Sequence, residues 1–294
     1  MEQLVQNLIL GLLLGGVYAL AAGGLTLIFG VMRVINIAHG AFLILAAFIT
    51  YSLWSGLGID PLLAIAITTP VVFVVGWVTY KLFVAPIRTA PMASTVLLTF
   101  GIALVVEAAM GTIWGNNSTA IRPPYGNESF TVGNLFLPKA QVYGGLVAVL
   151  VLAVLWVVLT KTWLGRAIRA SAVNPAGAEL IGIKIGSVAA LVFAIGIAAA
   201  GAGGALTGIL YPFVPGAHYQ WIARLLAIVV LGGMGSLNGA VLGALIFGVA
   251  ETMTAAYVSP SWATAVPYAI VFVVLLIRPQ GLLGSRLRED ALPA

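Results

Sequence analysis

Long uncharged apolar segments constrain this chain more than any other feature. The first runs from residue 3 to residue 32 without one charged side chain, too long for a signal-peptide core and therefore read as a retained helix. Further apolar stretches of about 20 residues, the length that crosses a hydrocarbon core, lie near 40–59, 61–80, 92–114, 141–160, 187–211, 239–258 and 262–278. Only 7% of the residues are charged, too few to cover a surface in water. We expect an all-α membrane protein, a polytopic helical bundle with eight clear crossings.

A shorter apolar piece at 219–232 leads into the glycine-rich turn GGMGSLNG at 232–239. Charge indicates whether this piece crosses, because short cytoplasmic loops concentrate Lys and Arg. With the N-terminus outside and the piece crossing, ten of the thirteen basic residues lie inside, and only Arg122 and Lys139 lie in an outer loop. The sequence therefore predicts about nine traverses, with one broken helix.

This topology makes residues 1–294 a single transmembrane domain with three polar segments. The loop 115–140, rich in Pro, Gly and Asn, is expected to be periplasmic and irregular. The loop 161–186 and the tail 279–294, both basic, are expected to be cytoplasmic.

Two glycine-rich interruptions, at 28–48 and 229–248, resemble each other. Each has an apolar run, a short polar break ending in Gly40 or Gly239, and then a helix of small residues. Transporters often contain repeats whose broken helices expose backbone groups near the substrate. The pattern is consistent with either a duplication or chance, because this topology puts both breaks on one side whereas an inverted repeat requires opposite sides.

Polar and glycine residues in these breaks and two intramembrane carboxylates are candidates for lining a translocation pathway. They are Asn36, His39, Gly40, Glu107, Gly235, Asn238, Gly239 and Glu251. A charge at the centre of a membrane helix costs about 2.5–3.5 kcal/mol, so both glutamates should face the bundle interior or water. The glutamates could also tether neighbouring helices. The alternative is structural: each glutamate sits near the interface or is protonated and hydrogen-bonded, and the histidine is a satisfied polar group.

The loop 161–186 predicts a helix, a turn and a second short helix. Arg166 and Arg169 share one helical face, opposite the apolar face formed by Leu164, Ala167, Ile168 and Ala172. Asn174 followed by Pro175 is typical of an N-cap and a first-turn proline. We interpret the loop as a docking site for a cytoplasmic partner, and an amphipathic helix lying on anionic lipid is the alternative.

Several function classes lack the residues that they need. The chain has no cysteine and only two histidines, which leaves no basis for a disulfide framework or a metal site. No Gly-Lys dipeptide occurs, so a P-loop is absent, and neither HExxH nor GxSxG is present. The basic residues flank apolar spans rather than forming a patch with aromatics, which argues against nucleic acid. The sequence predicts a non-enzyme that does not itself hydrolyse ATP.

Five segments together resemble the LivH-type permeases of branched-chain amino acid ABC importers. They are GLTLIFGVMRVINIAHGAF (24–42), GRAIRASAVNPAGAELIGIKIG (165–186), LGGMGSLNGAVLGA (231–244), GVAETMTAAY (248–257) and RPQGLLG (278–284). The resemblance extends in order over nearly the whole chain. Two positions depart from the family pattern: Ile37 and Leu283 each stand where phenylalanine is usual.

The resemblance implies a multi-pass subunit of the bacterial inner membrane that binds no cofactor, while ATP and Mg are used by partner subunits. The implied partners are a LivM-like second permease or a second copy of this chain, two cytoplasmic ATPase subunits, a periplasmic binding protein and membrane lipid. The residues implied in coupling to the ATPases are Arg166, Arg169, Asn174, Pro175, Glu179 and Gly182.

The same permease type also serves urea and short-chain amide importers, so these substrates stay open beside branched-chain and other hydrophobic amino acids. A rival from another class is an ion-coupled secondary transporter, which would use Glu107 and Glu251 for coupling.

Overall fold

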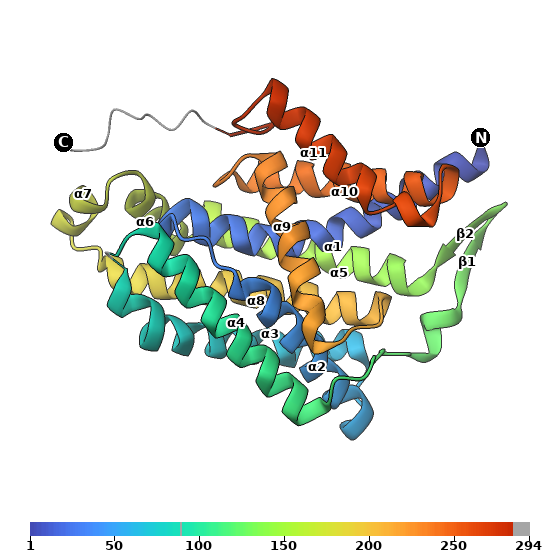
Figure 1. The fold of residues 1–294 in the computed structure, drawn as a ribbon, viewed down its shortest axis with the longest axis horizontal. Coiled ribbons are helices and arrows are strands. Elements are labelled where there is room, and N and C mark those ends of the chain that lie inside the picture. Colours follow the sequence, from blue (N-terminus) through green and yellow to red (C-terminus); the bar gives the residue numbers. More distant parts are fainter. Residues whose placement is uncertain (89, 285–294) are drawn as a thin grey trace.

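The computed structural model describes residues 1–88 and 90–284, which form a helical bundle with one short hairpin (Figure 1). Its helices are α1 (Glu2–Met32), α2 (Ala38–Leu57), α3 (Pro61–Thr79), α4 (Met92–Trp114), α5 (Lys139–Lys161), α6 (Trp163–Val173), α7 (Pro175–Leu180), α8 (Ile185–Leu210), α9 (His218–Gly232), α10 (Leu237–Tyr257) and α11 (Ala265–Ile277). Short helical turns are η1 (Tyr80–Val84), η2 (Ala85–Ile87), η3 (Pro124–Asn127), η4 (Pro215–Ala217) and η5 (Pro260–Trp262). The strands are β1 (Ser129–Val132) and β2 (Leu135–Pro138).

Seven helical spans within the described residues are long and apolar enough to cross a membrane: α1, α2, α3 with η1 and η2, α4, α5, α8 and α10. The expectation of a polytopic all-α bundle is confirmed, and the eighth apolar stretch forms a shorter helix. The stretch 262–278 forms α11, a helix of 13 residues that is about 20 Å long at 1.5 Å per residue. It begins only at Ala265, because the end of η5 and the turn residues 263 and 264 occupy the beginning of the apolar run.

Helices α1 and α8 form the centre of the bundle, and small residues let their neighbours approach closely. A Cβ atom added to Gly11 would lie 2.7 Å from Val249 Cα, and one added to Gly15 would lie 2.8 Å from Leu245 Cα, both on α10. Because lipid supplies no hydrophobic drive between helices, such backbone contacts are a main source of helix association. Helices α4 and α5 surround this centre and expose most of their apolar side chains.

The chain folds back on itself after α1. Residues 33–37 are non-helical, with Val34 and Asn36 buried and Arg33 exposed, and they return from the end of α1 to the middle of α8, where α2 begins. This position follows from two contacts, because a Cβ on Gly204 would overlap the Leu43 carbonyl and one on Gly208 would lie 3.0 Å from Ala47 Cβ. Helix α2 therefore starts inside the bundle rather than at its end. We call α2, and α9 below, half-helices because of this starting position, although α2 with 20 residues has the length of a full span.

The same arrangement follows α8, in the opposite direction. Residues 211–217 return from the end of α8 into the bundle, and α9 begins there against α2, since a Cβ on Gly40 would lie 2.5 Å from the His218 carbonyl oxygen. Helix α9 runs steeply across the direction of α1 (Figure 1). The helices that follow correspond as well, because α3 packs on α8 and α10 packs on α1. Helices α1 to α3 and helices α8 to α10 thus form an inverted repeat.

This repeat corrects the pairing of the two interruptions suggested by sequence. The counterpart of the break at 33–37 is 211–217, whereas the glycine turn at 232–239 only joins α9 to α10. The two return segments, 33–37 and 211–217, start at opposite ends of the bundle, as an inverted repeat requires. The objection that both breaks lie on one side therefore no longer applies. Each return segment leads into a helix at an Ala-His dipeptide, Ala38–His39 and Ala217–His218.

The outer loop 115–140 is more regular than expected. Strands β1 and β2 form an antiparallel hairpin joined by Gly133 and Asn134, and Gly133 has a φ of 61°. A Gly-Asn pair between two β-prone runs is a hairpin signal that the expectation of irregular structure overlooked. Asn134 Nδ2 donates to Glu2 Oε2 at 3.0 Å, so the hairpin and the N-terminus lie at the same end of the bundle.

Most described basic residues lie at the other end. They are Arg33, Lys81, Arg88, Lys161, Arg166, Arg169, Lys184 and Arg278. The start of the tail lies there too, because the Leu282 N–H donates to the Leu231 carbonyl oxygen at 2.8 Å. The rest of the tail, 285–294, with Arg286 and Arg288, lies outside the described residues.

Candidate functional site

The first part of the candidate site is the junction where α2 and α9 begin side by side. Gly40 makes this junction possible, because any side chain there would strike the His218 carbonyl oxygen and Ile222. Each helix N-terminus carries unpaired N–H groups and a partial positive charge. The junction therefore brings two positive helix ends together inside the bundle, a setting that favours a carboxylate.

Glu107 of α4 supplies that carboxylate. Its Oε2 lies 3.0 Å from His218 Nε2 and accepts a hydrogen bond from the Tyr219 hydroxyl at 3.1 Å. The His218 side chain is fully buried, whereas the Glu107 side chain keeps 28% of its surface exposed. The second half-helix thus begins at an ionisable group that a solute could reach.

The first half-helix begins in a closed setting. His39 is fully buried, and its Nε2 lies 2.9 Å from the Ala21 carbonyl oxygen of α1. Asn36 is also fully buried, and its amide atoms have no hydrogen-bond partner among the described residues. Thr99 of α4 fastens the backbone around it, because its hydroxyl oxygen accepts from Ile37 N–H at 3.2 Å.

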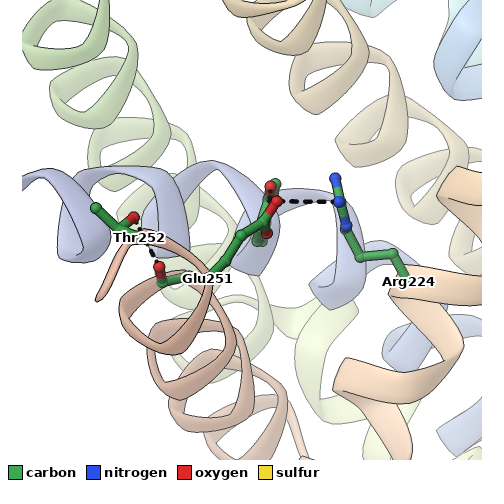
Figure 2. Close-up of polar contacts among 5 residues, drawn as sticks. Arg224, Glu251 and Thr252 are labelled. Carbon is green, nitrogen blue, oxygen red and sulfur yellow. Dashed lines mark hydrogen bonds and ion pairs between the residues drawn. The ribbon is translucent and has the colours of Figure 1, made fainter. Parts of the chain in front are cut away.

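A second polar cluster lies on the other side of α9. Figure 2 shows Arg224 reaching Glu251, with Arg224 Nη2 donating to Glu251 Oε1 at 3.1 Å. The Tyr18 hydroxyl donates to Glu251 Oε2 at 2.9 Å. The guanidinium also lies over the rings of Tyr18 and Trp221, 5.1 and 5.0 Å from their centroids. Two cation–π contacts and two hydrogen bonds compensate for removing this ion pair from water.

The glycine turn between α9 and α10 carries the remaining pathway candidates. Gly235 has a φ of 84°, and Gly239 N–H donates to Ser236 Oγ at 3.1 Å, capping α10. Gly235 and Asn238 line a cavity of about 320 Å³ that Arg169 of α6 also lines. This cavity connects the turn to the loop 161–186.

That loop folds as its pattern predicts, into α6 and α7. Ala167 and Ile168 are buried while Arg166 and Arg169 are exposed, and Arg169 donates to the Leu159 carbonyl oxygen at the end of α5. Asn174 Oδ1 accepts from Gly177 N–H at 3.0 Å, so it is the N-cap of α7.

The end of α7 presents the last coupling candidates. Pro175 is its first residue and Glu179 is exposed on it, and Gly182 closes the turn after it with a φ of 86°. The neighbouring apolar side chains Leu180 and Ile181 are 89% and 75% exposed. An apolar surface of this kind at the end of the bundle is typical of a protein contact.

The predicted pathway residues therefore fall into three groups. The structure brings Asn36, His39, Gly40 and Glu107 to the region of the junction, Gly235, Asn238 and Gly239 to the turn, and leaves Glu251 with Arg224. Sequence reasoning assigned no role to His218, Tyr219, Arg224 or Tyr18. Arg224 could have been found, because a cation in an apolar helix requires a partner and Glu251 is one of few intramembrane acids.

Comparisons with known proteins agree with this architecture. Residues 7–275 match the family described as branched-chain amino acid transport system / permease component. The chain is 30% identical to the high-affinity branched-chain amino acid transport system permease protein LivH of Escherichia coli K12, with 95% of each chain covered. It is also 30% identical to BraD of Pseudomonas aeruginosa, again with 95% of each covered.

A probable LivH of Methanocaldococcus jannaschii is 28% identical, with 90% of this chain and 88% of the relative covered. No solved structure matches the chain. The family match and the relatives both extend over nearly the whole chain, which therefore belongs to the branched-chain amino acid transport system permease family.

Proposed function

We propose that this chain is the membrane permease subunit of an ABC importer and forms part of a pathway for branched-chain or other hydrophobic amino acids across the inner membrane. The observation that carries the proposal is the full-length similarity to LivH and BraD, whose names state branched-chain amino acid transport. In this proposal the chain binds no cofactor, and partner ATPase subunits use ATP and Mg.

The pathway passes the junction of the two half-helices. Broken helices place backbone polar groups inside a membrane protein where they are useful for a solute. Glu107 provides the accessible charge there, and the Glu251–Arg224 pair offers one charge of each sign, which suits an ammonium and a carboxylate. Asn36, His39 and Gly40 lie at the start of the first half-helix. Gly235, Asn238 and Gly239 lie at the turn where the end of α9 packs closely on the start of α10, because a Cβ on Gly239 would overlap the Gly232 carbonyl.

The segment α6–α7 receives the movement of the ATPase subunits. Its exposed residues Arg166, Arg169 and Glu179 form the contact, while Asn174, Pro175 and Gly182 shape the turn. Because Arg169 lines the same cavity as Gly235 and Asn238, a displacement of α6 reaches the turn that carries α9.

The orientation follows from charge. The end with α6, α7 and eight of the described basic residues faces the cytoplasm, and the hairpin end faces the periplasm. A periplasmic binding protein then docks at the hairpin end, and two ATPase subunits dock at the other. The bundle pairs with a LivM-like permease or with a second copy of itself.

The experiment is reconstitution of the co-purified native complex in proteoliposomes with its binding protein. ATP-dependent uptake of labelled leucine is expected, with competition by other aliphatic amino acids but not by urea or short-chain amides. Stronger competition by urea or amides would mean that one of these compounds, and not an amino acid, is the substrate. Concentrative uptake by this chain alone under an ion gradient would contradict the proposal that it is a subunit of an ABC importer.

The coupling role has its own test. Arg169→Glu and, separately, Arg166→Glu should abolish the stimulation of partner ATPase activity by the loaded binding protein, because each reverses a charge on the exposed face of α6. Arg122→Glu, an exposed arginine at the hairpin end, is the control and should keep that stimulation. Normal stimulation in both α6 variants would contradict the docking role.

A further inference from the structure

Outside the candidate site, three cations meet in a hollow between the end of α3 and the beginning of α8. Lys81 of η1, Arg88 after η2 and Lys184 before α8 line a cavity of about 440 Å³, together with Tyr80, Gly186 and Ser187. The first two residues come from one segment and Lys184 from another almost 100 positions later. Within the described part of the chain, no acidic side chain lines this cavity.

In residues 1–88 and 90–284, no acidic side chain pairs with the three cations of this hollow. Among the described residues, none of the three cations forms an ion pair within 4.0 Å; Glu179 lines a neighbouring cavity with Arg88 without reaching it. Arg88 Nη1 also lies 3.5 Å from the position of a Cβ on Gly186, in the first turn of α8. A helix N-terminus favours anions and disfavours cations. The three cations therefore repel one another and the start of α8, and a bound anion would relieve this repulsion.

The surroundings indicate what the anion belongs to. Next to Lys81 on the same segment, Leu82 and Phe83 are 62% and 50% exposed, and Trp77 is 42% exposed. Lys81 Nζ lies 5.8 Å from the centre of the Trp77 ring. An aromatic and aliphatic face directly beside a cationic hollow, at the end of a membrane-spanning helix, matches a lipid with an acidic headgroup and its acyl chains.

We infer that this hollow is a binding site for the phosphate of an anionic phospholipid, held by Lys81, Arg88, Lys184 and the first turn of α8, with the acyl chains along Trp77 and Phe83. The site is separate from the translocation pathway and adjoins the segment α6–α7, because Tyr80 and Arg88 also line the cavity that Pro175 and Glu179 line. By filling it, one lipid would join the end of α3 to α8, which carries the centre of the bundle.

The test is native mass spectrometry of the purified full chain, released from micelles that contain phosphatidylglycerol and phosphatidylcholine in equal amounts. Phosphatidylglycerol should be retained preferentially, and Lys184→Gln should weaken its binding about fivefold, as expected for one basic residue near an anionic lipid. Lys184→Arg should retain it. Lys161→Gln removes an exposed lysine at the same end of the bundle but outside the hollow, and should leave retention unchanged.

Three outcomes would overturn the inference. The first is equal retention of the two lipids, or an equal loss in Lys161→Gln. The second is displacement of phosphatidylglycerol by the same concentration of inorganic phosphate, which would make the site an ion site. The third is a pair of results: the partner ATPase subunits displace phosphatidylglycerol, and these subunits are lost from the complex in Lys184→Gln. Together they would assign the hollow to a protein contact. The melting temperature of each variant in phosphatidylcholine alone shows that the variant is folded.

Discussion

The two return segments are related by the inverted repeat, yet their chemistry differs. In the first, His39 is bonded to the backbone carbonyl oxygen of Ala21, deep in the bundle. In the second, the corresponding His218 is bonded to the partly exposed carboxylate of Glu107. Six residues after each histidine, the first half-helix has Leu45 and the second has Arg224. One repeat is thus a closed scaffold, and the other carries the charges.

This asymmetry shows what a duplicated element contributes. Helix α4 contacts both breaks: Thr99 fastens the backbone of the first, and Glu107 meets the start of the second. The shared helix keeps the two half-helices in register, while only one of them offers ionisable groups to a solute. Function is therefore expected to be sensitive to changes in the second repeat, and stability to changes in both.

The largest effect is expected for Arg224→Leu, which gives the second half-helix the residue type of the first. Glu251 then stays mostly buried, at 14% exposure, without its cation. Removing one partner of such a pair should lower the free energy of unfolding by about 3 kcal/mol. The melting temperature of the purified chain in detergent measures the loss.

The double variant Arg224→Leu with Glu251→Leu separates structure from function. Without an uncompensated charge, most of the lost stability should return, whereas amino acid uptake in the reconstituted complex should stay lost. Normal uptake in the double variant would mean that both repeats are scaffolds and would break the comparison.

A somewhat smaller effect is expected where the half-helices touch. In Gly40→Ala the new Cβ lies 2.5 Å from the His218 carbonyl oxygen and 3.1 Å from Ile222 N. Because backbone atoms cannot rotate away, α2 and α9 must separate, at a cost of about 2 kcal/mol in the free energy of unfolding. Uptake should fall as well, since both half-helices shift.

Gly56→Ala is the matched control on the same helix, where an added Cβ meets no atom within 4 Å. Removing that glycine should leave uptake unchanged and leave stability equal or slightly higher. Equal behaviour of the two variants would show that the junction is not a close contact in the working protein.

Much of the fold could be predicted from the sequence, because the membrane demands long apolar helices and their lengths are visible directly. The pair α6 and α7 was also predictable, since its signal is local: arginines on one face and the Asn174–Pro175 start. The inverted repeat was not. Its two return segments, 33–37 and 211–217, share little beyond a following Ala-His pair, so the more similar glycine turn at 232–239 was matched instead.

The site was predictable residue by residue but not as an arrangement. Intramembrane Glu107 and Glu251 are conspicuous because of their cost, yet their partners come from residues more than 100 positions away or from another helix: His218 for Glu107, and Tyr18 and Arg224 for Glu251. Sequence spacing cannot bring such groups together, because it is the packing of small residues between helices that sets which faces meet.

The smallest effect is expected for Thr99→Val, which tests the closed repeat. The Thr99 hydroxyl oxygen accepts from Ile37 N–H at 3.2 Å, and losing this bond in a part-buried setting should lower the free energy of unfolding by about 1 kcal/mol. Uptake per folded molecule should stay normal, because the first break carries no group for the solute.

Glu107→Gln, on the same helix, is the opposite case: it nearly keeps the shape of the side chain but removes the charge at the second break, so uptake should fall more than stability. If Thr99→Val reduced uptake as much as Glu107→Gln does, the first repeat would belong to the pathway as directly as the second.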